Sequence, residues 1–105
     1  MESPRVTVRW EGNNTAVVVC RGEFDLDTAS VLAQACAGEA ASAELLVLDV
    51  RGVAFADSTF LNELLRLLQS RPVVLAGPLP GQLRRMLEMT GALALFEVRD
   101  DAATA

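Results

Sequence analysis

Ser58 is the residue whose surroundings in the sequence point most directly to chemistry. It lies in the stretch Phe55-Ala56-Asp57-Ser58-Thr59-Phe60-Leu61, which joins an apolar segment to an amphipathic one. The simpler interpretation is structural, with Asp57 or Ser58 capping a helix by accepting one of its unpaired N–H groups. The functional interpretation uses the same geometry, because a phosphate is well accommodated at a helix N-terminus. Ser58 is therefore a candidate cap and a candidate phosphorylation site.

Phosphorylation of Ser58 would change the surface charge rather than the fold. It would add roughly −1.5 to −2 charges beside Asp57 and would alter a docking surface by repulsion. A second acidic segment, Gly22-Glu23-Phe24-Asp25-Leu26-Asp27, follows another strand-like run and falls on the edge where α/β sheets usually bind ligands. We interpret Asp27 as a helix cap, whereas the residues alone leave Asp25 open between a turn and a binding role.

The composition excludes several kinds of site. The chain has no histidine, the commonest general base and metal ligand, and its nine basic residues are all arginine. Ser58 therefore lacks a histidine or lysine to activate it as a nucleophile. Two cysteines, Cys20 and Cys36, cannot fill a four-ligand zinc site. We expect no metal, no cofactor, no catalytic residue and no enzymatic activity.

Length and charge indicate the class of protein. A chain of 105 residues fits one domain, and a net charge of −5 without a basic run argues against nucleic acid binding. The apolar runs are far shorter than the roughly 20 residues that span a membrane. No signal peptide is evident, so we expect a cytoplasmic protein with free thiols. We also expect the folded core to cover residues 5–98 and the tail over 99–105 to be frayed.

Hydrophobic periodicity predicts strands that alternate with helices. Strict alternation and a Gly/Asn turn indicate an N-terminal antiparallel hairpin, and apolar residues at helical spacing mark three amphipathic helices. We place the start of the first helix at Asp27 or Thr28, as its cap. The predicted strands cover residues 5–10, 15–21, 45–50, 73–76 and 95–98, the helices 28–37, 58–70 and 81–90, and a loop 51–57.

This order of elements predicts an α/β fold. A hairpin followed by repeated strand–helix units forms a mixed sheet, in which the later strands are parallel and helices cover the sheet. The pattern leaves the spatial order of the strands open.

Several of these segments, taken together, resemble the STAS domain family, and in particular the anti-sigma factor antagonists of bacteria. The similarity covers residues 5–98. It includes Gly22-Glu23-Phe24-Asp25 before Thr28-Ala29, then Leu48-Asp49-Val50 leading through Val53 and Phe55 into Asp57-Ser58-Thr59, and finally Leu83-Arg84-Arg85-Met86-Leu87-Glu88-Met89-Thr90-Gly91. Each match is weak alone, but their order and spacing together are those of the family.

The resemblance implies a partner switch. In such proteins the serine at the position of Ser58 is phosphorylated by an anti-sigma factor that is also an ATP-dependent serine kinase. The unphosphorylated antagonist binds the anti-sigma factor and frees the sigma factor, phosphorylation ends this binding, and a serine phosphatase resets the cycle. Asp25 and Asp57 match acidic positions that help to engage the kinase, and Thr59 is the fallback phosphorylation site.

Phe60 departs from the family pattern, which has glycine after the Ser/Thr pair. Glycine there lets a partner approach the first helical turn closely. The ring of Phe60 either turns into the core, or it is exposed beside Asp57, Ser58 and Thr59 as a binding anchor or as an obstacle to the kinase.

A second function remains open because STAS domains also serve as accessory modules of transporters or as sensors of small ligands. That function requires binding of a protein or a small ligand without a kinase cycle. The Asp57-Ser58-Thr59 segment favours the switch, whereas Phe60 weighs against it.

Overall fold

The computed structural model describes residues 3–100. A five-stranded sheet has the spatial order β1-β2-β3-β4-β5, so each strand lies beside its neighbours in sequence. The strands are β1 (Arg5–Glu11), β2 (Thr15–Phe24), β3 (Leu45–Ala56), β4 (Val73–Ala76) and β5 (Glu97–Arg99), and the helices are α1 (Ser30–Ala37), α2 (Ser58–Ser70), α3 (Gly81–Thr90) and the 3-10 helix η1 (Ala92–Leu95).

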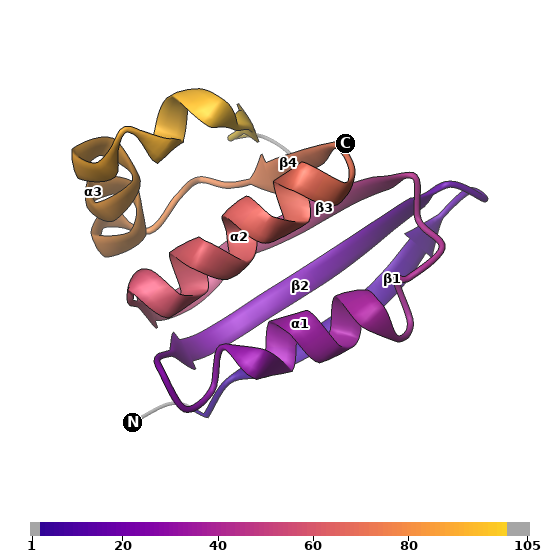
Figure 1. Cartoon of the computed structure of the whole chain (residues 1–105), viewed down its shortest axis with the longest axis horizontal. Coiled ribbons are helices and arrows are strands. Elements are labelled where there is room, and N and C mark those ends of the chain that lie inside the picture. Colours follow the sequence, from indigo (N-terminus) through magenta and orange to yellow (C-terminus); the bar gives the residue numbers. More distant parts are fainter. Residues whose placement is uncertain (1–2, 101–105) are drawn as a thin grey trace.

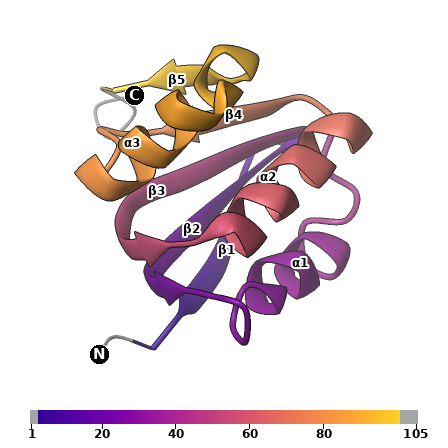
Figure 2. The same cartoon turned by 60° about the vertical axis from the view of Figure 1, so that its left-hand side comes forward.

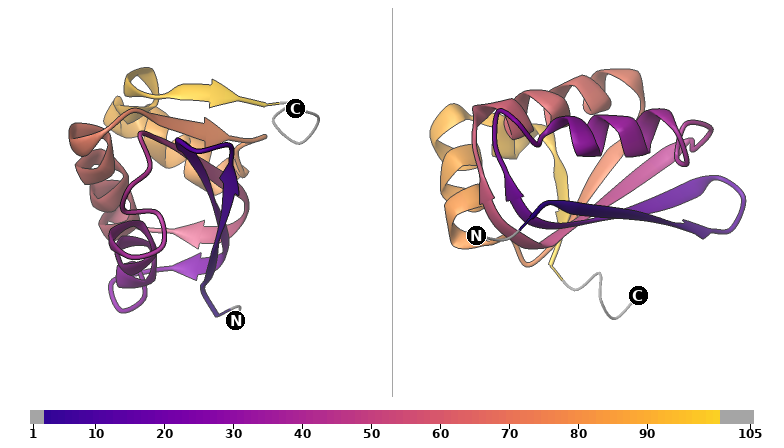
Figure 3. Two further views of the ribbon diagram at one scale, coloured as in Figure 1. Left: turned by 90° about the vertical axis from the view of Figure 1, so that its right-hand side faces the viewer. Right: turned by 90° about the horizontal axis from the view of Figure 1, so that it is seen from below.

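The sheet is mixed, as the sequence predicts. β1 pairs antiparallel with β2, and the other three pairings are parallel. Figures 1 and 2 show α1, α2 and α3 on the same face of the sheet, and Figure 3 shows the two layers from the side. The opposite face, which we call the open face, carries no helix among the described residues. The predicted α/β fold is confirmed.

The core lies between the sheet and the helices. Alternate residues of the central strands point toward the helices, which bury their leucine stripes against them. The interior is therefore filled mainly by branched aliphatic side chains and three phenylalanines, Phe24, Phe60 and Phe96. Its fully buried members include Val18, Leu48 and Leu75 of the sheet, Leu32, Leu64 and Leu83 of the helices, and Phe24 and Phe60.

β3 is longer than predicted, and the predicted loop over 51–57 is wrong. The strand continues to Ala56 because its pairing with β2 resumes after irregularities in register, ending with Phe24 opposite Ala56. An extra residue in one strand shifts the alternation of side chains. Because of this shift, the second half of β3 lacks the regular alternation by which a strand is recognised in the sequence. β2 and β3 therefore end side by side, immediately before the two acidic segments.

The first helix begins later than predicted. α1 starts at Ser30, and Ala29 at its N-cap makes no side-chain capping bond, so neither Asp27 nor Thr28 caps it. Thr28 is instead part of a turn closed by Asp25, because a short polar side chain that bonds its own backbone nearby favours a turn over a helix.

The C-terminal region also differs from the prediction. η1 occupies residues 92–95, and the last strand covers 97–99 rather than 95–98. Gly91 has a φ of 79°, which ends α3 in the left-handed region that favours glycine. Of the predicted frayed tail, residues 101–105 lie outside the described residues.

Both cysteines are buried and neither forms a disulfide. Burial raises the pKa of the Cys20 thiol far above its ordinary value, and burial also raises that of Cys36 to about 11. No helix within residues 3–100 is long and apolar enough to cross a membrane.

Candidate functional site

Asp57 caps α2. Its backbone is extended, and its carboxylate accepts hydrogen bonds from the backbone N–H of Thr59, at 2.9 Å, and from the Thr59 hydroxyl. The backbone N–H of Asp57 donates to the carbonyl of Phe24 at 3.1 Å, so the junction is also tied to the end of β2. Of the two predicted caps, Asp57 or Ser58, the structure selects Asp57.

The Asp57 carboxylate is stabilised in its charged form. Partial burial raises its pKa, but hydrogen bonds from the Thr59 side chain and from the backbone of Thr59, Phe60 and Leu26 outweigh burial, so the pKa lies below its ordinary value. Asp57 therefore keeps its negative charge at neutral pH, beside the first residue of α2.

Ser58 is exposed at the first position of α2. Its hydroxyl makes no hydrogen bond with the residues that the structure describes, whereas the Thr59 hydroxyl is held by Asp57. Thr59 is half-buried. Ser58 is therefore the more accessible of the two candidate phosphate acceptors, and Thr59 is occupied with capping.

Asp25 closes the turn that follows β2. Its Oδ1 accepts hydrogen bonds from the Asp27 backbone N–H at 3.0 Å and from the Thr28 hydroxyl at 2.9 Å. The carbonyl of Asp25 accepts from the N–H groups of Thr28 and Ala29. Asp25 is half-buried. Asp25 thus has a turn role, while its second carboxylate oxygen makes no hydrogen bond within residues 3–100.

The two acidic segments meet at one edge of the sheet. Phe24 and Ala56 are register partners, so Asp25 and Asp57 directly follow neighbouring parallel strands. Leu26, between Asp25 and Asp27, is 76% exposed, an unusual exposure for a leucine. Sequence reasoning missed Leu26, although a leucine between two aspartates in a turn is a readable signal. The arrangement presents a negatively charged surface that includes the apolar side chain of Leu26.

Phe60 lies in the core, so of the two orientations left open by the sequence the buried one is found and the exposed partner contact is not. Its exposed fraction is 0%, and its ring centroid lies 4.9 Å from that of Phe24 at an interplanar angle of 43°. The physical reason is position: as the third residue of α2, Phe60 falls on the helix face that turns toward the sheet. The ring therefore neither blocks Ser58 nor anchors a partner.

Gln82 of α3 holds the backbone of β3 immediately before the site. Its side-chain amide donates to the Ala56 carbonyl at 2.6 Å and accepts from the Ala56 N–H at 2.9 Å. This pair of bonds fixes the end of β3 immediately before Asp57. Sequence reasoning missed Gln82 because a glutamine 26 residues away carries no local signal of this contact.

The chemistry available at this edge is binding and modification. Within residues 3–100 no three histidine, cysteine, aspartate or glutamate side chains gather as metal ligands. What the arrangement offers is an accessible hydroxyl at a helix N-terminus, flanked by two fixed carboxylates. A phosphate there would be favoured by the helix and would add to an existing negative surface.

Comparison with known proteins identifies the family. The family model described as "Mlab, STAS domain" matches residues 6–97. The crystal structure of an anti-sigma factor antagonist from Mycobacterium paratuberculosis is similar, with a TM-score of 0.76 and 30% sequence identity over 92% of this chain and 86% of that one. No curated protein sequence matches the chain.

Two more distant structures share the fold. The anti-sigma factor antagonist SpoIIAA in its unphosphorylated form has a TM-score of 0.75 at 13% identity, over 95% of this chain and 92% of that one. An uncharacterized protein of the DUF3478 family from Shewanella loihica PV-4, with a SpoIIAA-like fold, has a TM-score of 0.56 at 8% identity, over 95% of this chain and 86% of that one. The family match and the shared fold together confirm the predicted resemblance: the chain belongs to the STAS domain family.

Proposed function

We propose that this protein is an anti-sigma factor antagonist switched by phosphorylation of Ser58. In the unphosphorylated form it binds an anti-sigma factor with serine kinase activity, which releases a sigma factor; the phosphorylated form dissociates, and a serine phosphatase restores it. The observation that carries the proposal is the exposed Ser58 at the start of α2, beside Asp57 and the turn of Asp25. The similarity to the Mycobacterium antagonist supports the choice of partner.

The electrostatics support this mechanism. Asp25 and Asp57 are held by local hydrogen bonds, so their charges stay in place when a partner docks. A partner that matches this surface presents positive charge, and a phosphate on Ser58 would alter that match by close to two further negative charges. Because Thr59 and Asp57 already form the cap, the added group would leave α2 folded and would act on the interface alone.

The test uses the unphosphorylated protein as bait in a native cell extract with ATP, followed by intact-mass analysis of the bait. We expect a gain of one phosphate on Ser58 and capture of an ATPase-type kinase, while a Ser58→Ala bait captures the kinase without gaining phosphate. No phosphate, with a transporter subunit in the eluate, would overturn the switch in favour of the accessory module. Phosphate on Thr59 alone would overturn the assignment to Ser58.

Two substitutions of Asp25 distinguish the effect of its charge on binding from the effect of its side chain on the stability of the turn. Asn in place of Asp25 keeps an oxygen that accepts from Asp27 and Thr28, whereas Ala removes it. We expect Asp25→Asn to weaken partner binding about tenfold with little loss of stability. Asp25→Ala should weaken binding similarly and lower the free energy of unfolding by about 1 kcal/mol, as loss of a turn-closing side chain does. Calorimetric titration and urea unfolding measure both quantities, and unchanged binding by Asp25→Asn would exclude a role for the charge.

A further inference from the structure

The open face of the sheet carries a pair of arginines in an unfavourable position. Arg5 of β1 and Arg21 of β2 are register partners, and both are exposed. The neighbouring partners Val6 and Cys20 point toward the helices, so the two arginines point together to the open face. Like charges directly opposite one another across two strands destabilise a sheet. An anion bound between the two guanidinium groups would offset this repulsion.

A third arginine lies on the next strand and is held rigidly. Arg51 of β3 donates from Nε to Asp49 at 3.0 Å and from Nη2 at 2.8 Å, and its backbone N–H also donates to Asp49. Asp49 is the one buried charged residue within residues 3–100. The hydrogen bonds from the Arg51 side chain, and to a smaller extent the charge of Arg21, hold the pKa of Asp49 below its ordinary value. Asp49 thus fixes the position of the Arg51 guanidinium.

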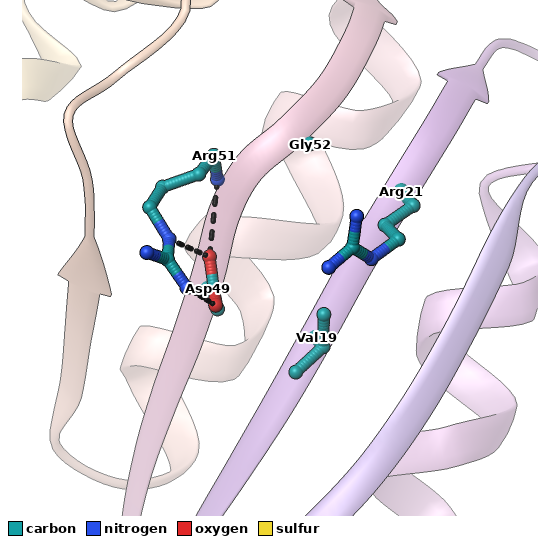
Figure 4. Close-up of a pocket in the computed structure, with 5 residues that line it drawn as sticks. All are labelled: Val19, Arg21, Asp49, Arg51 and Gly52. Carbon is teal, nitrogen blue, oxygen red and sulfur yellow. Dashed lines mark hydrogen bonds and ion pairs between the residues drawn. The ribbon is translucent and has the colours of Figure 1, made fainter. Parts of the chain in front are cut away.

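Gly52 leaves space for a hollow between Arg51, which precedes it in β3, and Arg21, which lies opposite it in β2. Gly52 is the register partner of Arg21, and a Cβ on Gly52 would lie 2.9 Å from Cγ of Arg21. The missing side chain lets the stem of Arg21 lie across β3. A hollow of about 270 Å³ results, lined by Val19, Arg21, Asp49, Arg51 and Gly52 (Figure 4).

Other arginines of the same face are neutralised along their own strand. Arg9 pairs with Glu11 at 3.3 Å, and Arg99 pairs with Glu97 at 2.8 Å, each two residues away. Glu23 stands at the same spacing from Arg21, but within residues 3–100 neither Arg21 nor Arg5 forms an ion pair. Three guanidinium groups against the single carboxylate of Asp49 leave this cluster with a net charge of +2, in a protein of net charge −5.

We infer that Arg5, Arg21 and Arg51 form a binding site on the open face for the phosphate group of a small molecule. The +2 charge of the cluster matches a phosphate monoester, which carries close to two negative charges at neutral pH. The planar fork of a guanidinium donates two parallel hydrogen bonds to phosphate oxygens, and the rigid Arg51 lowers the entropic cost of binding. The volume of the hollow leaves room for further atoms attached to the phosphate.

The test measures inorganic phosphate binding to the unphosphorylated protein by calorimetry and thermal unfolding, at an ionic strength held constant with sodium chloride. It needs no protein partner or kinase, so its outcome is independent of the switch at Ser58. At ten times the dissociation constant, bound phosphate should favour the folded state about tenfold. We expect Arg21→Gln and Arg5→Gln to weaken phosphate binding at least about tenfold. Arg9→Gln and Arg99→Gln are matched controls from the same face and should bind as the wild type does.

The stability of the variants without phosphate distinguishes the loss of a binding group from a general change in charge. Without phosphate, Arg21→Gln should be at least as stable as the wild type, because it relieves the repulsion from Arg5. If adenosine monophosphate binds more tightly than phosphate, the ligand of the site is a nucleotide. If the two bind equally, the ligand is free phosphate. Absence of phosphate binding by the wild type, or equal weakening in all four variants, would overturn the site.

Discussion

Phe60→Ala is expected to lower the free energy of unfolding by about 3–5 kcal/mol, the range for truncating a fully buried phenylalanine. The ring has no exposed surface and packs against Phe24, so its removal leaves a cavity under the first turn of α2. Small domains have only about 5–15 kcal/mol of stability in total, so the variant should unfold at much lower urea concentration. Urea unfolding followed by circular dichroism measures the change.

Phe55, near the end of β3, provides a matched control for Phe60. Phe55 is 43% exposed, and Phe55→Ala should cost clearly less than Phe60→Ala because its ring is only partly covered. Combining Phe60→Ala with Phe24→Ala should cost less than the sum of the two single changes, since the second truncation enlarges a cavity already present. Equal, small losses from Phe55→Ala and Phe60→Ala would contradict the burial of Phe60.

Ser58→Asp is expected to weaken binding of the anti-sigma factor about 100-fold, equivalent to close to 3 kcal/mol of binding free energy. The new carboxylate would lie beside Asp57, whose pKa is lowered and which is therefore charged at neutral pH. An acidic residue in the first turn of a helix is favourable for the helix itself. The loss should therefore appear in binding and not in folding.

Ser58→Asn provides the control for shape. Asparagine has nearly the size of aspartate but no charge, so Ser58→Asn should bind at least about tenfold more tightly than Ser58→Asp if charge controls release. Ser58→Ala should bind as the wild type does. Calorimetric titration with the purified partner, repeated at higher salt, measures these differences, and equal affinities of the Asp and Asn variants would rule out a charge switch.

The sequence predicted the class of fold because local patterns determine it. The alternation in β1, the apolar runs of β3 and β4, and the leucine spacing of α2 each indicate one element. The second half of β3 was missed because irregular pairing with β2 breaks the period-two pattern on which strand prediction depends. The start of α1 was misplaced because Asp25 and Thr28 bond to each other instead of capping a helix.

The candidate site was predicted where neighbouring residues build it, and missed where the fold brings distant residues together. Asp57, Ser58 and Thr59 are consecutive, so the capping geometry is readable from their order. The exposure of Leu26, the support of Ala56 by Gln82 and the opposition of Arg5 and Arg21 all depend on which strands and helices are neighbours. The direction in which the ring of Phe60 turns likewise depends on how α2 is rotated against the sheet.

The end of β3 illustrates how a side chain can substitute for a strand. β4 pairs with β3 only from Leu46 to Asp49, so the rest of β3 extends past its neighbour without a strand on that side. Such a free edge recruits extended chains and promotes aggregation. The amide of Gln82 satisfies both backbone groups of Ala56 and so closes the last position of this edge. A strand added along this edge would therefore find both backbone groups of Ala56 already bonded, two residues before Ser58.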